Sequence, residues 1–483
     1  MNVLFVASEC APFVKTGGLA DVIGAVPKSL NALGSVVKVL IPGYPALAGE
    51  MAAGKTVTEF SDLFGGPARI VEVASDGLDM LLLEAPHLFD RPGNIYLGAD
   101  GRDWPDNHLR FGALSLAGAH IAQHGVEGWL PDVVNAHDWQ AGLLPVYLHQ
   151  SEGRRPPVIM TIHNIAFQGI FGAENLAQLK LKSEMFTPDG VEYFGKISFL
   201  KGGLALSDKI TTVSPSYAAE LMMPEFGMGM EGLLQARSDD LTGILNGIDL
   251  DVWNPETDPA LPATYSSRKL KAKMQNRSVV QQRFDLSDTA TGPLFCAISR
   301  LTSQKGLDML LDCLPALVAR GAQLAILGSG DKDIEQAFIS AASRYPGSVG
   351  VVIGYNEDLS HLMQGGSDAI LIPSRFEPCG LTQLYGLRYG TIPVVARTGG
   401  LADTIIDAND AANLANCATG FQFAPITSEM LDQTIARACT MFGSPKDWNA
   451  MVRRAMKHPV GWDRSAKAYL DVYASVQKSG SPK

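Results

Sequence analysis

The chain has 483 residues, which is too long for one ordinary hydrophobic core, so two domains are expected. Hydrophobic residues make up 46% of it and charged residues 18%, a balance typical of a compact globular protein rather than a disordered one. The net charge of −11 argues against general binding to nucleic acid or to anionic lipid, although a local cationic pocket stays compatible with it.

Neither the amino terminus nor the cysteines indicate export. Residues 1–10 are apolar but lack a basic n-region and reach Glu9, so a buried first strand is expected rather than a signal peptide. No apolar run approaches the roughly 18 residues that a membrane span needs. Six scattered cysteines without a Cys-x-x-Cys spacing indicate reduced thiols, and we expect a cytoplasmic protein.

Short apolar runs alternate with helical patterns through most of the chain. Continuous apolar runs without polar alternation are typical of a parallel sheet covered on both faces, and alternation with helices predicts right-handed βαβ units. The sequence therefore predicts an α/β protein with doubly wound parallel sheets. The expected strands are residues 3–7, 36–41, 133–136, 158–162 and 210–213 in the first half, and residues 294–298, 324–327, 349–353, 369–372 and 392–395 in the second.

The least regular stretch, residues 254–293, contains three early prolines and then a charged helical pattern over residues 266–284. We place the hinge between the domains just before it, near residues 246–251. The predicted organisation is an N-terminal Rossmann-like domain over residues 1–245 and a C-terminal Rossmann-like domain over residues 246–460. A final helical segment, residues 461–483, is expected to pack back on the first domain.

One hexapeptide, Thr-Gly-Gly-Leu-Ala-Asp, occurs at residues 16–21 and again at residues 398–403. Each copy follows a strand-like region and begins a helical pattern. The copies could be two unrelated glycine-rich turns, or both domains could present a glycine turn and a helix N-terminus to a shared cleft, where N–H groups favour an anion. Lys15, just before Gly17 and Gly18, adds a mobile charge suited to a diphosphate or a sugar oxygen.

Two motifs follow predicted strands of the second half. Arg300 and Lys305 come directly after residues 294–298, at a strand end where open α/β sheets bind ligands, so they could bind phosphate or lie in a solvated basic loop. Glu377 precedes Pro378, which keeps it out of the helical conformation. Its carboxylate could accept hydrogen bonds from a ligand or cap its own helix.

In the first half, His137 and Asp138 follow one predicted strand, and His163 and Asn164 follow the next. All four could line one cleft, but a histidine at a strand end could also be a structural residue.

Several familiar signals are missing. The sequence has no Gly-x-x-x-x-Gly-Lys-Ser/Thr motif, which argues against a P-loop nucleotidase, and no Gly-x-Gly-x-x-Gly after the first strand, which argues against a nicotinamide enzyme. Aspartate pairs at residues 249–251 and 331–333 have a spacing that could hold a metal, but such pairs are common by chance and no metal is expected.

Taken in order, these motifs closely resemble those of the bacterial glycogen synthases and plant-type starch synthases, retaining glycosyltransferases of the GT-B architecture. The resemblance covers essentially the whole chain. It implies two Rossmann-like domains with a deep interdomain cleft, the first on the acceptor side and the second on the donor side. The matching motifs are residues 15–22, 135–143, 163–169, 199–203, 212–217, 246–249, 299–306, 354–356, 373–382 and 398–404.

The resemblance also implies a reaction and its residues. The enzyme would transfer glucose from ADP-glucose to the non-reducing 4-hydroxyl of glycogen or another α-1,4-glucan, with retention of configuration and without a cofactor or metal. The implied catalytic residues are Glu377, His163, Lys305, Arg300 and Asp138. The implied donor-binding residues are Lys15, Gly17, Gly18, Asp21, Asn246, Arg300, Lys305, Tyr355, Cys379, Gly380, Leu381 and Thr382.

Within that set, Arg300 and Lys305 would bind the donor phosphates, Glu377 would face the transferred glucose, and Tyr355 would stack on the adenine. Ser303 departs from the family, whose members often have a bulkier aromatic residue there, and this affects only local packing.

Two other functions compete with this one. A related transferase could use UDP-glucose or another acceptor. A non-catalytic glucan or sugar-nucleotide sensor could share the scaffold, but it would not need to keep Lys15, His163, Arg300, Lys305 and Glu377 together. No nucleic-acid or membrane partner is expected, and the oligomeric state stays open.

Overall fold

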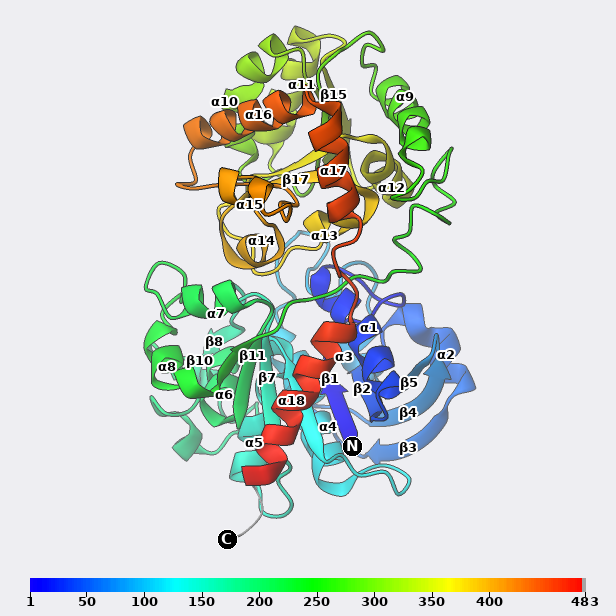
Figure 1. Cartoon of the computed structure of the whole chain (residues 1–483). Coiled ribbons are helices and arrows are strands. Elements are labelled where there is room, and N and C mark those ends of the chain that lie inside the picture. Colours follow the sequence, from blue (N-terminus) through cyan, green and yellow to red (C-terminus); the bar gives the residue numbers. More distant parts are fainter. Residues whose placement is uncertain (480–483) are drawn as a thin grey trace. The chain divides into compact units, whose positions relative to one another are not determined.

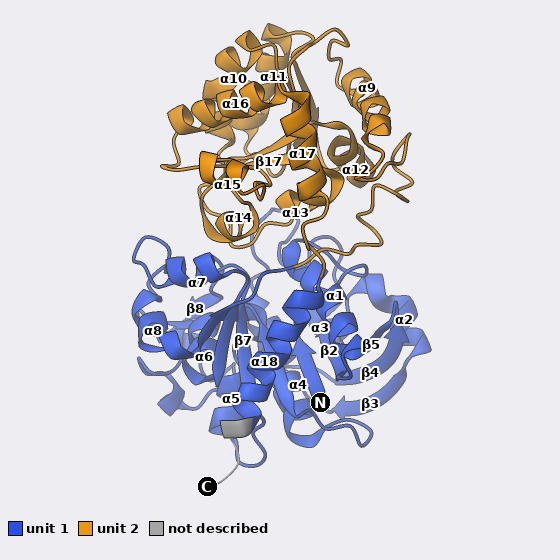
Figure 2. Cartoon of the chain, in the orientation of Figure 1, with its two compact units in different colours: residues 1–246, 462–483 blue, residues 247–461 orange. Residues whose placement is uncertain are grey.

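The computed structural model describes residues 1–479, and the chain divides into two compact units (Figure 1, Figure 2). Unit 1 consists of Met1–Asn246 and Trp462–Lys483, and unit 2 of Gly247–Gly461. The domain boundaries predicted from the sequence, after residues 245 and 460, each lie one residue before these. Residues 480–483 of the predicted C-terminal segment lie outside the described residues.

Unit 1 is built on a nine-stranded sheet with the order β12-β11-β7-β6-β1-β2-β5-β4-β3. Its strands pair in parallel except β4, which runs antiparallel to both neighbours. A second, antiparallel sheet has the order β8-β10-β9. The strands are β1 (Asn2–Val6), β2 (Val36–Pro42), β3 (Lys55–Phe60), β4 (Ala68–Ser75), β5 (Leu78–Glu84), β6 (Val133–His137), β7 (Val158–Ile162), β8 (Ile170–Gly172), β9 (Glu192–Tyr193), β10 (Lys196–Ser198), β11 (Lys209–Thr212) and β12 (Leu241–Gly243).

Helices connect these strands and cover the large sheet (Figure 1). They are α1 (Gly18–Ala32), α2 (Ala48–Ala53), α3 (Pro86–Phe89), α4 (Asn107–His124), α5 (Leu144–Gln150), α6 (Phe199–Leu206), α7 (Pro215–Leu221), α8 (Glu231–Ala236) and α18 (Asp463–Ser479), with short 3-10 turns at Pro45–Leu47, Trp139–Ala141, Ala173–Asn175, Ser183–Met185 and Ser238–Asp240. The last helix, α18, is drawn in red and lies against α1.

A buried hydrogen bond fixes α18 to the sheet of unit 1. The Tyr473 hydroxyl donates to the side-chain oxygen of Asn135 over 2.7 Å, and the Asn135 amide nitrogen donates to Thr161 Oγ1 over 2.7 Å. Asn135 is a polar residue inside a buried strand, so both ends of its amide need such partners.

Unit 2 contains one parallel sheet of six strands with the order β15-β14-β13-β16-β17-β18. These strands are β13 (Leu294–Ile298), β14 (Gln323–Gly328), β15 (Val349–Ile353), β16 (Ala369–Ile372), β17 (Ile392–Ala396) and β18 (Phe421–Phe423). The helices are α9 (Lys273–Arg283), α10 (Leu307–Ala319), α11 (Lys332–Arg344), α12 (Glu357–Gly366), α13 (Thr382–Tyr389), α14 (Gly399–Thr404), α15 (Asp410–Leu414), α16 (Ser428–Phe442) and α17 (Pro445–Ala455), with 3-10 turns at Leu270–Ala272 and Ser303–Lys305.

Each of the ten strands predicted from apolar runs coincides with a strand of the structure, and the α/β fold class is confirmed. The hairpin β4–β5 was not predicted, although the two residues between its strands, Asp76 and Gly77, both have positive φ and Asp-Gly is a common hairpin turn. The charged pattern at residues 266–284 becomes an α-helix only from Lys273 onward. Within residues 1–479, no helix is both long and apolar enough to cross a membrane.

Both parallel sheets reverse their strand order at one point. In unit 1 the reversal lies between β1 and β6, and in unit 2 it lies between β13 and β16. At such a pair, the chain that follows one strand and the chain that follows the other run in opposite directions. The loops at the carboxyl ends of the two strands therefore separate and leave room for a ligand. The strand order therefore marks one candidate ligand-binding edge in each unit.

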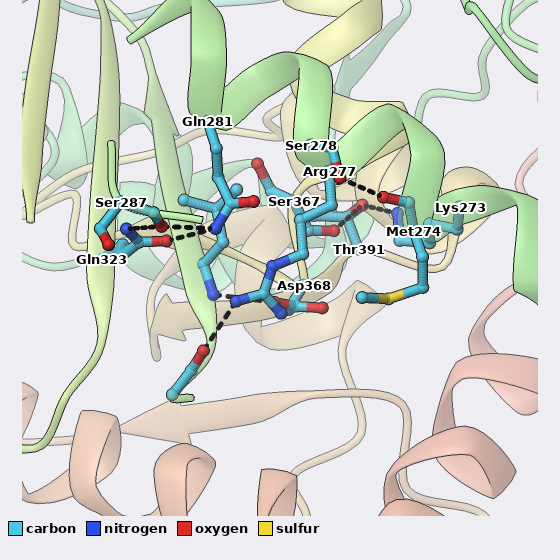
Figure 3. A network of polar contacts seen from close by, with 12 residues as sticks. Lys273, Met274, Arg277, Ser278, Gln281, Ser287, Gln323, Ser367, Asp368 and Thr391 are labelled. Atoms are coloured by element: carbon cyan, nitrogen blue, oxygen red, sulfur yellow. Dashed lines mark hydrogen bonds and ion pairs between the residues drawn. The ribbon is translucent and has the colours of Figure 1, made fainter. Parts of the chain in front are cut away.

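A buried polar network attaches α9 to the rest of unit 2 (Figure 3). The Lys273 ammonium donates to Thr391 Oγ1 over 2.8 Å, and also to the main-chain carbonyls of Gln364, Gly365 and Tyr389. These carbonyls lie at the C-terminal ends of α12 and α13, where the helix dipoles favour a cation. Burial lowers the pKa of Lys273 to about 7.

Replacing Lys273 with methionine should lower the free energy of unfolding by about 3 kcal/mol or more, because several buried carbonyl groups then lose their donor. Urea unfolding measures this change. The matched control is Lys271→Met on the same segment, where the lysine is exposed and the effect should stay within about 0.5 kcal/mol. Equal stability of the two variants would contradict the anchoring role.

Candidate active site

The carboxyl end of β13 leads into a loop that carries the two predicted phosphate-binding residues. Lys305 closes a 3-10 turn, and Gly306 follows with a φ of 69°. A β-carbon on Gly306 would lie 2.0 Å from the carbonyl oxygen of Pro373, so glycine lets this loop pack against the loop after β16. The side chain of Arg300 is exposed, and within residues 1–479 it makes no hydrogen bond or ion pair.

The loop after β16 holds Glu377 against Lys305. Their carboxylate oxygen and ammonium nitrogen are 2.5 Å apart, and the Ser374 hydroxyl donates to the same oxygen over 2.9 Å. Both side chains of the ion pair are largely buried, at 17% exposure for Lys305 and 11% for Glu377. Ile298, Leu371 and Thr382 line a small pocket together with this pair. The structure therefore brings Lys305 and Glu377 together.

The predicted sugar-contacting residues Cys379, Gly380, Leu381 and Thr382 form the turn into α13. Gln383, which is fully buried, donates from Nε2 to the carbonyl oxygens of Cys379 and Gly380 over 3.0 and 2.9 Å. These bonds fix the turn from behind. The Gln383 Oε1 atom is buried without a hydrogen-bond partner among the described residues.

The second copy of the repeated hexapeptide supports this turn and does not offer open donors to a ligand. The main-chain N–H of Gly400 donates to the carbonyls of Glu377 and Pro378, and a β-carbon on Gly399 would lie 2.1 Å from the Glu377 carbonyl oxygen. The hypothesis that both copies present an anion-binding helix N-terminus is therefore wrong for unit 2, because the close approach of two backbone segments requires the glycines there.

The first copy lies after β1 in unit 1 and is built differently. The Glu9 carboxylate accepts hydrogen bonds from the main-chain N–H groups of Thr16 and Gly17 and from the Thr16 hydroxyl, over 2.6 to 3.2 Å. Two of the backbone donors expected to face a ligand therefore bind Glu9. Gly17 and Gly18 have open space where a side chain would project. Lys15 pairs with Asp21 over 2.7 Å and stays 40% exposed, so it can exchange this partner for an anion.

The loops after β6 and β7 bring three predicted residues into direct contact. His137 Nδ1 lies 3.0 Å from His163 Nε2, and Asp138 Oδ1 accepts from the main-chain N–H of His163 over 2.7 Å. Asp138 has a φ of 53° and a ψ of −174°, a combination outside the left-handed helical region that aspartate sometimes adopts. Strained backbone of this kind is common at functional sites.

Burial sets the charge states of this cluster. It lowers the pKa of His163 to about 3 and that of His137 well below its usual value, so both rings are neutral at pH 7. The two neutral rings share one hydrogen bond, and in either tautomer His163 Nδ1 stays outside it. His137 Nε2 is buried and has no hydrogen-bond partner among the described residues.

Two predicted donor-binding residues lie outside the loops described so far. Tyr355 follows β15 in unit 2, and Asn246 lies at the boundary of unit 1. The Tyr355 ring is 77% exposed, and its hydroxyl donates to Glu357 over 2.6 Å. Asn246 ends the first segment of unit 1, and its side-chain oxygen is buried without a partner among the described residues. An unpaired buried amide oxygen is uncommon, and a donor for that of Asn246 is not found among the described residues.

Sequence reasoning missed Glu9, Ser374 and Gln383, which hold the predicted residues in place. Glu9 had a usable signal, since it is a carboxylate at the end of a buried strand. Ser374 and Gln383 lie inside recognised motifs, but nothing in their spacing distinguishes them. Among residues 1–479, no group of three histidine, cysteine, aspartate or glutamate residues could hold a metal ion.

Comparisons with known proteins show to which family this chain is similar. Residues 2–236 match the family model of the starch synthase catalytic domain, and residues 280–454 match that of glycosyl transferases group 1. A glycogen synthase of Roseobacter denitrificans is 67% identical over 98% of this chain and 99% of its own, and glycogen synthase 1 of Rhizobium meliloti is 52% identical over 99% and 100%. The solved catalytic domain of starch synthase IV from Arabidopsis thaliana, bound to ADP and acarbose, is 29% identical with a TM-score of 0.87 and 99% coverage of both chains.

The pKa of Asp138 predicts a pH effect on stability. Burial, with a further contribution from Glu9, raises this pKa from 3.8 to about 7. Between these values the folded state binds more protons than the unfolded state, so Asp138 makes the protein less stable as the pH rises through that window. Asp138→Asn keeps the acceptor oxygen without the charge. The free energy of unfolding of Asp138→Asn should therefore rise relative to that of wild type, by about 2 kcal/mol from about pH 5 to pH 8.

Urea unfolding at several pH values measures that gain. Asp239→Asn, which alters an exposed carboxylate of unit 1, should follow the wild-type pH dependence. If the Asp138→Asn curve also runs parallel to wild type, then Asp138 does not titrate as its burial requires.

Proposed function

Because this chain belongs to the glycogen synthase family of glycosyltransferases, we propose that it transfers glucose from ADP-glucose to an α-1,4-glucan. The accepting group is the 4-hydroxyl at the non-reducing end, the anomeric configuration is retained, and ADP is released. Support for the donor comes from a relative, since the starch synthase IV structure is described as bound to ADP and acarbose.

One observation carries the proposal within this chain. Lys305 and Glu377 form a largely buried ion pair at the strand-order reversal of unit 2, and the exposed Arg300 lies on the same loop as Lys305. Two cations at this edge fit a diphosphate, and a carboxylate beside them fits sugar hydroxyls. We propose that Arg300 and Lys305 bind the donor phosphates and that Glu377 accepts hydrogen bonds from the transferred glucose.

The proposed chemistry needs only groups of this kind. The bond between the anomeric carbon and the phosphate oxygen breaks, and its electron pair stays on the departing diphosphate. Arg300 and Lys305 stabilise that developing charge, which is an effective device in a site that excludes water. The acceptor 4-oxygen bonds to the anomeric carbon from the face that ADP leaves, and its proton passes to the departing phosphate. No metal takes part in these steps.

The surroundings of Glu377 favour a binding role over a nucleophilic one. A carboxylate that attacked the sugar would form a covalent glycosyl intermediate, as in retaining glycosidases. Here one Glu377 oxygen already accepts from both the Lys305 ammonium and the Ser374 hydroxyl, and these bonds reduce its nucleophilicity. In unit 1, we propose that the neutral His163 and the strained Asp138 act on the transferred sugar and the acceptor.

ADP release from ADP-glucose with glycogen present tests the function. Rapid release that persists with a metal chelator, with UDP-glucose a poor donor, is the expected result. Activity with UDP-glucose alone would overturn the donor, and loss of activity with the chelator would overturn the metal-free chemistry. No release from either donor would favour the sensor.

Arg300→Ala and Lys305→Ala should each lower kcat at least about 100-fold, because each removes a cation from the leaving diphosphate. The controls are Arg453→Ala and Lys446→Ala, which remove exposed cations of α17 and should leave kcat unchanged. Urea unfolding verifies that the variants fold. Wild-type turnover in either loop variant would rule out the assignment of that residue to the phosphates.

We also propose that the protein acts in the cytoplasm. All six cysteines are free, and Cys10, Cys296, Cys313 and Cys379 are buried. Free thiols of this kind are typical of proteins in a reducing compartment.

A further inference from the structure

Unit 1 exposes a small group of apolar side chains beside its three-stranded sheet. Phe194 is 79% exposed, Phe167 58% and Met228 47%. Single exposed apolar residues are ordinary, but clustered ones often mark a binding surface. We call Tyr193, Phe194 and Met228 the Phe194 patch.

The backbone at Phe194 has a strained conformation. Phe194 and Gly195 are the two residues between β9 and β10, and both have positive φ, at 47° and 76°. Asparagine, aspartate or glycine normally occupies the first position of such a hairpin turn, and a bulky residue with positive φ is an outlier. Strain of this kind persists where the side chain has a function.

Hydrogen bonds hold the patch together from three separate segments. The main-chain oxygen of Met228 accepts from the Tyr193 hydroxyl over 2.6 Å and from Gln168 Nε2 over 3.0 Å. The Tyr193 and Phe194 rings meet edge to face, with centroids 4.7 Å apart. A β-carbon on Gly229 would lie 3.3 Å from the Phe194 ring, so glycine there leaves room for the aromatic residue.

One loop connects the patch to the candidate site of unit 1. Gln168 lies five residues after His163, and the main-chain N–H of Phe167 donates to the carbonyl of Asn164 over 3.2 Å. Gly169 packs against the Trp139 ring, which follows Asp138, and a β-carbon there would lie only 2.3 Å from that ring. The loop that carries His163 therefore also carries Gln168, whose hydrogen bond holds Met228 in the patch.

We propose that the Phe194 patch binds glucose units of the α-glucan acceptor, an inference that rests on the proposed function. A pyranose ring has an apolar face of C–H groups, which fits an exposed aromatic ring and a thioether, and a rim of hydroxyls, which fits polar side chains of the same hairpin such as Glu192 and Lys196. A nucleotide would require clustered cations instead. A second copy of this chain would usually bury about 1,000 Å² or more, which is a much larger surface than three side chains offer.

Phe194→Asn is the test variant, because asparagine suits the hairpin turn and removes only the ring. In gels that contain glycogen and no donor, its affinity should fall about tenfold. With ADP-glucose, its KM for glycogen should rise by a similar factor while kcat is unchanged. Phe194→Trp should keep wild-type affinity. The matched control is Leu414→Asn, at an 84% exposed apolar residue of unit 2, which should also keep it.

Three other outcomes of these measurements would overturn the proposal or assign the Phe194 patch to another partner. Wild-type glycogen affinity in Phe194→Asn would overturn it, as would an absence of glycogen binding in the wild-type protein. A change of oligomeric state without a change in affinity would assign the patch to a second copy. Because binding is measured without donor, failure of the patch stays distinguishable from failure of ADP-glucose turnover.

Discussion

Two pairs of neighbouring parallel strands, β1 with β6 and β13 with β16, are the constraint on which both units depend. At each pair the connecting chain leaves in opposite directions, so the loops at the carboxyl ends diverge. Lys15, Asp138, Lys305 and Glu377 lie on those loops, and His163 lies on the loop of β7, the strand next to β6.

Buried polar side chains convert these loops into rigid structures. Glu9 holds the turn at Thr16 and Gly17, Gln383 holds the turn at Cys379 and Gly380, and Lys305 holds Glu377. Each such group would cost free energy if left unpaired, so each specifies one loop conformation. Loops fixed before the substrate arrives need less reorganisation during the reaction.

The sequence was most informative where one physical rule dominated. Continuous apolar runs located the ten predicted strands, because only a strand covered on both faces tolerates them. The strands of the short antiparallel sheet escaped this rule because they are only two or three residues long. Strand β5 was also missed, although residues 80–83 form a buried apolar run. The motif residues Lys305 and Glu377 were predicted from their position after strands, and the structure brings them together.

The failures have a common physical cause. The six identical residues at 16–21 and 398–403 have opposite uses, since Gly399 and Gly400 pack against another backbone segment while Gly17 and Gly18 face open space. The partners of Glu9 and Gln383 likewise depend on segments brought together by folding. The residues of a turn determine which interactions it can make. The segments that pack against it, which are distant in the sequence, determine which of these interactions it does make.

The return of the chain to unit 1 has a consequence for biosynthesis. Asn135 lies in the middle of the first sheet, yet its side-chain oxygen accepts from the hydroxyl of Tyr473, near the carboxyl end. During translation the first sheet emerges long before that tyrosine, and the whole of unit 2 is made between them. The nascent first unit must therefore wait, with one face of its sheet uncovered by α18, until unit 2 and α18 have been synthesised, which makes this stage the most dependent on protection from aggregation.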